Sequence, residues 1–324
     1  MRLSTALSAT IRVTAPARLH LGFLDLNGAI GRRFGSIGLA IDKPETELTL
    51  KRSSHDEARG LESKRALALV RKFAREAPSG GYAVDIEKAI PAHAGLGSGT
   101  QLALAIGAAV ARMEGRELSA ADLATLGQRG ARSGIGLAAF EAGGFIVDGG
   151  KGPNDRPPPL TLRADFPDAW RILLILDQTG AGVSGEAELT AFADLPEFPQ
   201  SAAAHICHLV LMKLIPALKE ADLAPFGAAI TEIQEIVGGH FANKQGGSAW
   251  TNPAVGRLAG RMQAMGAKGI GQTSWGPTGF AFADTPAAAE RLYDSLVEEA
   301  KGDGLNILVA RGRNTGASIE TIQS

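Results

Sequence analysis

The most constraining feature of this sequence is a glycine-rich stretch, residues 91–101, that joins a strand pattern to a helix pattern. Before it, apolar and polar residues alternate over 82–86, and after it apolar residues recur at helical spacing over 102–113. Ser98 and Gln101 have the spacing of a capping box. Glycines let a backbone approach an anion closely, and a helix start offers unpaired N–H groups with partial positive charge. The stretch therefore predicts either a phosphate cradle or a turn that only needs positive φ angles.

Composition confines the chain to a few protein classes. Its 324 residues are enough for two domains, and a net charge of −1 gives no electrostatic reason to bind nucleic acid or an anionic membrane. Cys207 is the single cysteine, which excludes an intramolecular disulfide and disfavours a cysteine-based zinc site. The N-terminus lacks an apolar signal-peptide core, and no uninterrupted apolar run reaches about 18 residues. We therefore expect a soluble, reduced, cytoplasmic protein.

The remaining patterns predict strands and helices in mixed order. Besides the strand before the glycine-rich stretch, strands are expected over residues 11–15, 47–51, 170–177 and 305–309, the last being the final one. Helices are expected over residues 61–76, 202–219, 223–237 and 286–301. The first strand is expected to enter a turn at Pro16, and Thr285 to cap the last helix. Because strands and helices do not alternate steadily, an α+β fold is favoured over a doubly wound sheet.

Three segments in this order resemble the GHMP superfamily, named for galacto-, homoserine, mevalonate and phosphomevalonate kinases. Residues 91–101 look like its phosphate loop, 16–22 like its N-terminal substrate motif, and 269–279 lie where its C-terminal glycine-rich loop belongs. The resemblance implies an α+β, GHMP-kinase-like fold of two domains, which we place at residues 1–165 and 166–324. The first would be similar to domain 2 of ribosomal protein S5, with a left-handed β-α-β unit, and the second would be ferredoxin-like.

Details of the sequence resemble one branch of that superfamily, the β-ribofuranosylaminobenzene 5′-phosphate synthases. The similarity covers most of the chain and is carried by residues 18–28, 31–38, 97–101, 132–136, 143–145, 148–150 and 271–278. That family joins 4-aminobenzoate, or 4-hydroxybenzoate in some members, to phosphoribosyl pyrophosphate. It releases carbon dioxide and pyrophosphate on the way to tetrahydromethanopterin. Many of the kinases carry a catalytic Asp in a Ser-Gly-x-Asp segment, whereas Gly136 stands at the candidate position here, which weakens a phosphoryl-transfer interpretation.

The resemblance implies a glycosyltransferase (a pentosyltransferase) of one-carbon metabolism. Such a protein must cradle pyrophosphate, clamp an aromatic carboxylate and exclude water from a reactive sugar cation. The cradle is assigned to Gly95, Gly97, Ser98, Gly99 and Thr100, while Gln101 either touches the ligand or caps the helix. Mg²⁺ is expected to bridge pyrophosphate and protein oxygens, with its protein ligands left open, and no ATP is required.

Three residues near the N-terminus are the candidates for catalysis. Asp25 is either a metal ligand or cation stabiliser, or a turn-former beside Asn27. Arg18 offers a bidentate grip, and His20 is either an active-site group or a buried, hydrogen-bonded histidine. Further substrate-binding candidates are Arg32, Arg33, Ser36, His93, Ser274 and Trp275. For this second set the alternatives are a solvated loop charge for either arginine and a packed core position for the tryptophan.

Two other functions stay open at this point. An ATP-dependent small-molecule kinase of the same superfamily would convert ATP to ADP, and a non-catalytic ligand-binding protein would turn over nothing. A synthase predicts carbon dioxide release without ATP. The expected partners are small-molecule substrates, with no nucleic acid and no membrane. A homodimer through residues 209–215 and 223–237 is the alternative to burying those residues in a core.

Overall fold

The fold is that of a computed structural model, in which residues 9–74, 80–130, 132–154, 156–177, 195–274 and 276–323 are described. A larger sheet runs in the order β11-β1-β2-β4-β3, and β5 and β6 extend it from β2. Its strands are β1 (Ala9–Asp25), β2 (Phe34–Ser53), β3 (Glu57–Gly60), β4 (Gly81–Lys88), β5 (Phe145–Asp148), β6 (Leu160–Ala164) and β11 (Ser318–Gln323). All pairs are antiparallel except β3 with β4, which enclose a helix in a parallel β-α-β unit.

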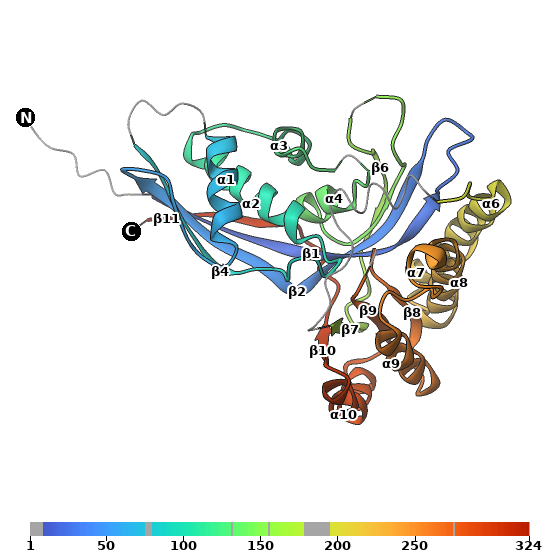
Figure 1. The fold of residues 1–324 in the computed structure, drawn as a ribbon. Coiled ribbons are helices and arrows are strands. Elements are labelled where there is room, and N and C mark those ends of the chain that lie inside the picture. Colours follow the sequence, from blue (N-terminus) through green and yellow to red (C-terminus); the bar gives the residue numbers. More distant parts are fainter. Residues whose placement is uncertain are drawn as a thin grey trace, which may run out of the picture.

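One face of the larger sheet is covered by helices (Figure 1). They are α1 (Ser63–Phe73), α2 (Ser98–Met113), α3 (Ala120–Gly127) and α4 (Ile135–Glu141). Small and apolar residues recur throughout α2, so most of this helix is buried against the sheet and its neighbouring helices. The expected strand over 82–86 and the helix that follows it are therefore confirmed, and the glycine-rich stretch joins them.

A smaller sheet of four antiparallel strands runs in the order β10-β7-β9-β8. Its strands are β7 (Arg171–Asp177), β8 (Lys268–Gln272), β9 (Gly279–Ala283) and β10 (Leu305–Ala310). This is the strand order of a ferredoxin-like domain, as expected. Its helices are α6 (Gln200–Leu209), η1 (Val210–Leu214), α7 (Ile215–Glu220), α8 (Leu223–Phe241), η2 (Ala242–Lys244), α9 (Pro253–Ala264) and α10 (Pro286–Gly302). Thr285 caps α10 by accepting the Ala288 N–H at 3.2 Å, which confirms the predicted cap.

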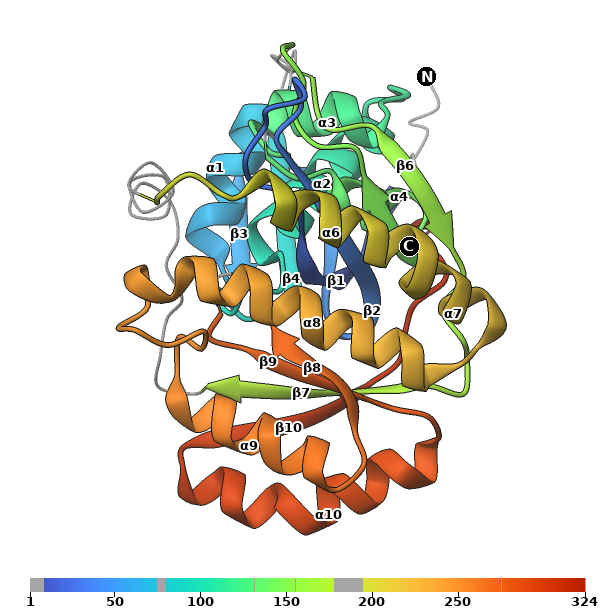
Figure 2. The same ribbon diagram turned by 90° about the vertical axis from the view of Figure 1, so that its right-hand side faces the viewer.

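The two sheets share one hydrophobic core. Leu19 and Leu39 of the larger sheet belong to the same buried cluster as Phe226 of α8 and Phe282 of β9. Helices α6 and α8 cross the molecule where the two parts meet (Figure 2). The sheet changes between β6 and β7, close to the expected division at residue 165. However, β11 returns to pair with β1, so the expectation that 305–309 is the final strand was wrong.

β1 continues through Pro16, so the predicted turn there was also wrong. The pairing of β1 with β2 shifts register between Pro16 and Ala17, where an irregularity accommodates a residue that lacks an N–H. Before the shift, Ile11 and Val13 pack under α1–α3, whereas after it Ala17 and Leu19 pack in the core shared by both sheets. The irregularity thus re-aims the alternate side chains of β1, as bulges do.

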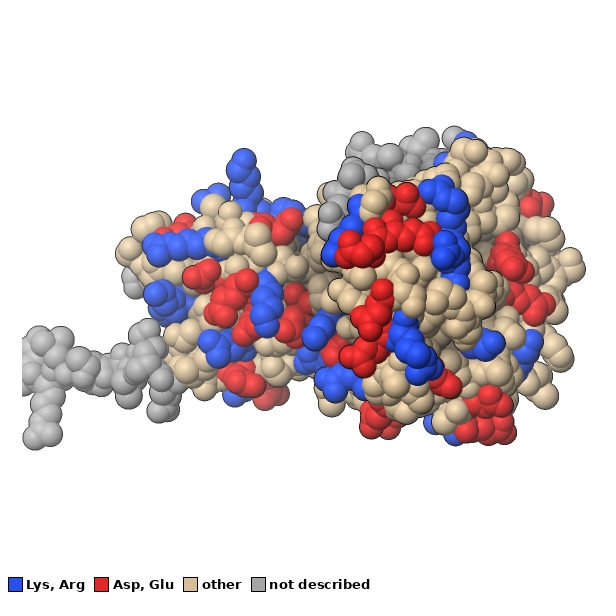
Figure 3. Space-filling view, turned by 90° about the horizontal axis from the view of Figure 1, so that it is seen from below, with Lys and Arg blue, Asp and Glu red and all other residues tan. Residues whose placement is uncertain are grey.

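One apolar helix and the distribution of surface charge are relevant to the expectation of no membrane and no nucleic acid as partners. The continuous helical run Gln200–Glu220 is, by length and composition, the one described helix that could cross a membrane. One side of it packs against α8 and contributes to the shared core, whereas Leu211 and Met212 on this helix are exposed. On the face shown in Figure 3, basic and acidic side chains are interspersed rather than segregated by sign. That face therefore offers no broad basic surface for a polyanion.

Candidate active site

The glycine-rich turn opens the N-terminus of α2. Gly97 is the N-cap with φ 83°, and its carbonyl accepts the N–H groups of Thr100 and Gln101 at 3.1 and 3.0 Å. No side chain caps this end, so the N–H groups of Ser98 and Gly99 have no acceptor among the described residues. This is the open helix start that an anion can occupy.

The predicted capping box is wrong. The side chain of Gln101 is fully buried, and its Nε2 donates to the carbonyl of Gly136 in α4 at 2.8 Å. A residue four places into α2 that faces α4 cannot reach back to the helix end. Gln101 therefore joins two helices beneath the turn, and it is not among the residues that line the cavity described below.

Thr273 joins the segment around His20 to the two glycine-rich segments. Its hydroxyl accepts the backbone N–H of His20 at 2.9 Å and donates to the carbonyl of Gly95 at 2.9 Å. The N–H of Ser274 donates to the carbonyl of His20 at 3.4 Å. Segments more than 150 residues apart in the sequence are thus held around one buried hydroxyl. Ser274 has φ 56°, a sparsely populated conformation that is concentrated at functional sites.

Arg18 lies along the turn. Its backbone N–H donates to the carbonyl of Leu96 at 3.1 Å, and its Nη1 donates to the carbonyl of Gly95. A Cβ at Gly97 would stand 3.1 Å from Cγ of Arg18, so glycine is needed for this close approach as well as for its φ angle. The guanidinium is therefore fixed at the open end of α2.

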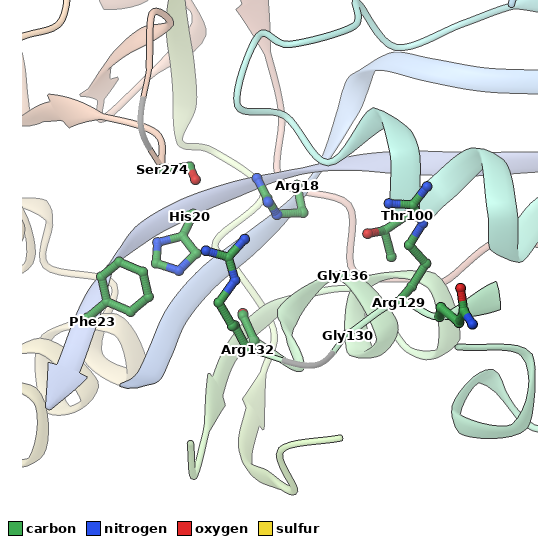
Figure 4. Close-up of a pocket in the computed structure, with 11 residues that line it drawn as sticks. Arg18, His20, Phe23, Thr100, Arg129, Gly130, Arg132, Gly136 and Ser274 are labelled. Carbon is green, nitrogen blue, oxygen red and sulfur yellow. The ribbon is translucent and has the colours of Figure 1, made fainter. Parts of the chain in front are cut away.

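A cavity of about 250 Å³ lies over this end of α2. It is lined by Arg18, His20, Phe23, Thr100, Gln128, Arg129, Gly130, Arg132, Ser133, Gly136 and Ser274. Figure 4 shows Arg18, His20 and Arg132 gathered on one side and Arg129 beside Thr100 on the other. Three arginines from two segments thus face a space that adjoins a helix N-terminus.

Sequence reasoning missed two of these arginines. Arg129 and Arg132 lie between α3 and α4, in a segment where Gly130 has φ 75° and Gln128 has φ 55°. The signal that could have identified them is the pairing of basic residues with glycines just before a helix, in the stretch 128–134. The resemblance included part of this stretch, but it did not identify these arginines as binding residues.

The electrostatics of the cavity favour a bound anion. Burial, with the nearby charges of Arg18 and Arg132, lowers the pKa of His20 to about 3, so its imidazole is neutral at physiological pH. Burial and the charge of Arg65 also lower the pKa of Arg129. A Cβ at Gly99 would meet the guanidinium of Arg65 at 2.8 Å, so this arginine also flanks the turn. Crowded cations of this kind are stabilised when an anion binds between them.

A narrow slot of about 20 Å³ adjoins the cationic cavity, and its lining mixes aromatic and aliphatic side chains with the polar side chains of Gln234, Gln245 and Gln272. His20, Phe23 and Ser274 line both spaces. Val237 and Phe241 of α8 line the slot but not the cavity. The rings of His20 and Phe23 are 4.4 Å apart. The Nε2 of His20 is buried and has no hydrogen-bond partner among the described residues. His20 therefore stands between the cationic cavity and this narrow slot.

The other nominated residues lie away from the cavity. Asp25 accepts the N–H groups of Asn27 and Gly28 at 2.7 and 2.9 Å, which is the geometry of the turn-forming alternative. The hairpin arginines are also engaged with backbone: Arg32 donates to the carbonyls of Gly149 and Gly150, and Arg33 to that of Leu26. Ser36 is fully buried in β2, His93 is exposed before the turn, and Trp275 lies outside the described residues.

The described residues do not fit a metal ion held by the protein. Mg²⁺ is usually bound through one or two carboxylates together with substrate phosphates. The described lining of the cavity carries arginines, a neutral histidine and hydroxyls, but no carboxylate. Across the described part of the chain, no group of three or more His, Cys, Asp or Glu side chains could hold a metal ion. The expected protein ligands for Mg²⁺ are therefore not provided by this set.

Comparison with known proteins agrees with this geometry. Residues 64–144 match the family model of the GHMP kinases N terminal domain, and residues 214–302 match that of the GHMP kinases C terminal domain. The solved structures that are similar include homoserine kinase from Cytophaga hutchinsonii, with a TM-score of 0.68 and 18% identity over 99% of both chains. Mevalonate diphosphate decarboxylase from Staphylococcus aureus has a TM-score of 0.65 and 17% identity over 97% of this chain and 98% of its own. At such identities they establish the fold alone.

Curated relatives are more similar in sequence. The β-ribofuranosylphenol 5′-phosphate synthase of Methanothermobacter thermautotrophicus is 34% identical, over 94% of this chain and 97% of its own length. The protein of the same name from Archaeoglobus fulgidus is 35% identical, over 96% of this chain and 99% of its own. The similarity therefore extends over nearly the full length of both relatives.

Proposed function

Because the chain belongs to the GHMP kinase superfamily and, within it, to the β-ribofuranosylphenol 5′-phosphate synthases, we propose that it is a decarboxylating phosphoribosyltransferase. It is a pentosyltransferase-type enzyme. The proposed reaction joins 4-hydroxybenzoate or 4-aminobenzoate to phosphoribosyl pyrophosphate and releases carbon dioxide and pyrophosphate. The proposed pathway is tetrahydromethanopterin biosynthesis, in the cytoplasm. The names of the relatives carry a phenol, which favours 4-hydroxybenzoate as the acceptor.

The observation that carries the proposal is the cationic cavity at the start of α2. Phosphoribosyl pyrophosphate presents a pyrophosphate and a 5′-phosphate, and both need cations or N–H donors. The open turn offers N–H groups at Ser98 and Gly99, and Arg18, Arg129 and Arg132 face the same space. Guanidinium groups bind phosphate oxygens through paired, charge-assisted hydrogen bonds. The donor set is thus the one that a departing pyrophosphate requires.

The chain's own groups then support each bond change. The bond between ribose C1 and the pyrophosphate oxygen breaks, and the arginines stabilise the negative charge that leaves. The ring carbon that bears the carboxylate attacks C1, and the carbon–carbon bond to the carboxylate breaks to release carbon dioxide. The electron pair of that bond restores the aromatic ring. The hydroxyl or amino group opposite supplies electron density during attack, so no organic cofactor is required.

The position of His20 suggests where the acceptor lies. We place the ring beside Phe23, at the junction of the cationic cavity and the narrow slot. A neutral imidazole there has a nitrogen, Nε2, that no described residue engages. Being neutral, it does not repel the sugar cation, and it contacts the acceptor by a hydrogen bond. The ring of Phe23 and the bound aromatic acceptor shield the sugar cation from water on this side.

The same lining disfavours the kinase alternative. Many GHMP kinases use an Asp at the position where this chain has Gly136, and a Cβ there would already stand 3.1 Å from Cγ2 of Thr100. No carboxylate lines the described part of the cavity, so a base for phosphoryl transfer is missing from that set. We propose that no ATP is needed, and that Mg²⁺ enters bound to phosphoribosyl pyrophosphate rather than to carboxylates of this chain.

The test is release of labelled carbon dioxide. The protein is incubated with Mg²⁺, phosphoribosyl pyrophosphate and carboxyl-labelled 4-hydroxybenzoate or, in a parallel series, 4-aminobenzoate. Label should be released only when both substrates are present, and ATP should make no difference. Strict dependence on ATP would favour the kinase, and binding of both substrates without any turnover would favour a ligand-binding protein. The ratio of kcat/KM between the two acids would identify the acceptor.

A further inference from the structure

A buried carboxylate at the end of β5 holds the segment that carries two of the arginines. Asp148 is only 1% exposed. Its Oδ2 accepts the N–H of Gly134 at 2.8 Å and the hydroxyl of Ser133 at 3.3 Å. Its Oδ1 accepts the N–H groups of Gly150 at 2.9 Å and Ser36 at 3.2 Å. One carboxylate thus ties together β2, β5 and the start of α4.

We propose that Asp148 is a positioning residue of the anion-binding cavity: its hydrogen bonds to Ser133 and Gly134 fix the backbone that follows Arg132 and so place this arginine over the start of α2. Asp148 does not line the cavity, so it acts through that segment and not by touching the ligand. The inference rests on the proposed function only for the identity of the anion.

The geometry of the segment explains why it needs such an anchor. It leaves α3 at Gln128, whose φ is 55°, and turns at Gly130, whose φ is 75°. Its next fixed point in the described residues is Gly134, the N-cap of α4, where no side chain of the helix itself provides a cap. Arg132 stands between these points. Without the carboxylate, the hydroxyl of Ser133 and the N–H of Gly134 would lose their common acceptor, and Arg132 would lose its nearest anchor.

A carboxylate suits this position better than a neutral group. All four partners of Asp148 are donors, and an ionised carboxylate is an acceptor at both oxygens. An asparagine of the same shape would turn an NH₂ group toward two of those donors. The isosteric change therefore removes acceptor capacity without opening a cavity, which makes it a sharp test of the hydrogen bonds themselves.

The two glycines that follow extend the same bracket to the hairpin between β1 and β2. The carbonyls of Gly149 and Gly150 accept Nε and Nη2 of Arg32 at 2.6 and 2.7 Å. A Cβ at Gly150 would stand 2.6 Å from the carbonyl oxygen of Arg33, so the close approach requires glycine. The motif Asp148-Gly149-Gly150 therefore contacts the hairpin between β1 and β2 as well as the start of α4.

The experiment measures binding of inorganic pyrophosphate by titration calorimetry and, separately, steady-state kinetics and thermal melting. Asp148→Asn should weaken pyrophosphate binding by about 10- to 100-fold, and Ser133→Ala, which removes only one of the four donors, by about 3- to 10-fold. KM for phosphoribosyl pyrophosphate should rise in step, while kcat at saturation changes less. Asp122→Asn is the matched control, because that carboxylate completes the cap of α3 with Ser119 and makes no hydrogen bond to Ser133 or Gly134 among the described residues.

The outcomes separate a positioning role from a general structural one. The control should lower the melting temperature and leave the dissociation constant for pyrophosphate within about twofold of that of the wild type. Unchanged pyrophosphate binding in folded Asp148→Asn, or equal weakening in the control, would overturn the inference. If Asp148→Asn does not fold, Asp148→Glu, which keeps the charge but displaces the carboxylate by one methylene, decides in the same way. Pyrophosphate can bind without the aromatic acid. A wild type that binds pyrophosphate but releases no carbon dioxide would therefore refute the proposed function and leave the inference about Asp148 standing.

Discussion

The hydroxyl of Thr273 joins the segment around His20 to the two glycine-rich segments, so one substitution tests the junction of all three segments. Thr273→Val keeps the shape of this fully buried side chain and removes both of its hydrogen bonds. The carbonyl of Gly95 keeps its second donor, Nη1 of Arg18, so the main loss falls on the N–H of His20. A buried backbone group left without a partner costs about 1–3 kcal/mol. In a protein of this size we expect the melting temperature to fall by roughly 2–6 °C.

The matched control for this variant lies five residues further along. Thr278 is also fully buried, but its hydroxyl has no hydrogen-bond partner among the described residues. Thr278→Val should therefore leave stability unchanged or raise it, because it removes a buried polar group that gains nothing. Calorimetric melting of both variants gives the comparison, and KM for phosphoribosyl pyrophosphate should rise about tenfold for Thr273→Val only. Equal losses of stability in the two variants would refute the reasoning that this hydroxyl joins the segments.

Three further outcomes follow from the same geometry. Gly97→Ala and Gly115→Ala should each cost about 1 kcal/mol, since both glycines have positive φ, but only the first crowds Arg18 and should weaken pyrophosphate binding in calorimetry. Arg129→Met should leave the melting temperature of the free protein unchanged or higher, because it relieves repulsion with Arg65, yet reduce the stabilisation by pyrophosphate in thermal-shift measurements. The pKa of His20 is lowered to about 3 from 6.5, so only the unfolded state takes up a proton at this residue as pH falls below about 6.5. The free energy of unfolding should therefore fall toward pH 3 by up to about 1.4 kcal/mol per pH unit. His20→Gln should flatten that dependence in thermal melts between pH 4 and 7.

Local patterns were sufficient to predict the elements that build the cavity floor. The glycine-rich turn, the strand before it and α2 follow from alternation, helical spacing and glycine chemistry within one short segment. The meeting of this turn with Arg18, His20 and Ser274 followed from the resemblance, and the contacts of Thr273 supply its physical basis. The capping box failed because the same spacing also places Gln101 against α4, and helical periodicity cannot tell an end from a buried face.

What the sequence did not reveal depends on contacts between distant segments. Arg132 lies next to Ser133 and Gly134, which a carboxylate on β5 engages, whereas the N–H of Arg129 donates to the carbonyl of Ala124 at the end of α3. Arg32 was a plausible ligand group by residue type, but the carbonyls of a distant turn engage its guanidinium. The course of β1 past Pro16 likewise depends on a register shift against β2, which no single-strand pattern encodes.

The pairing of β11 with β1 also has a consequence for biosynthesis. Residues Ala9–Thr14 find their partner strand only after roughly 300 further residues have been made, which takes about 15–60 s at translation rates of about 5–20 residues per second. During that interval one edge of β1 lacks its neighbour in the finished sheet, and an uncovered edge can recruit strands from other nascent chains. A nascent chain would therefore depend on holdase chaperones for longer than a protein whose sheets close in order of synthesis. Deletion of β11 should make that exposure permanent and direct the product toward inclusion bodies.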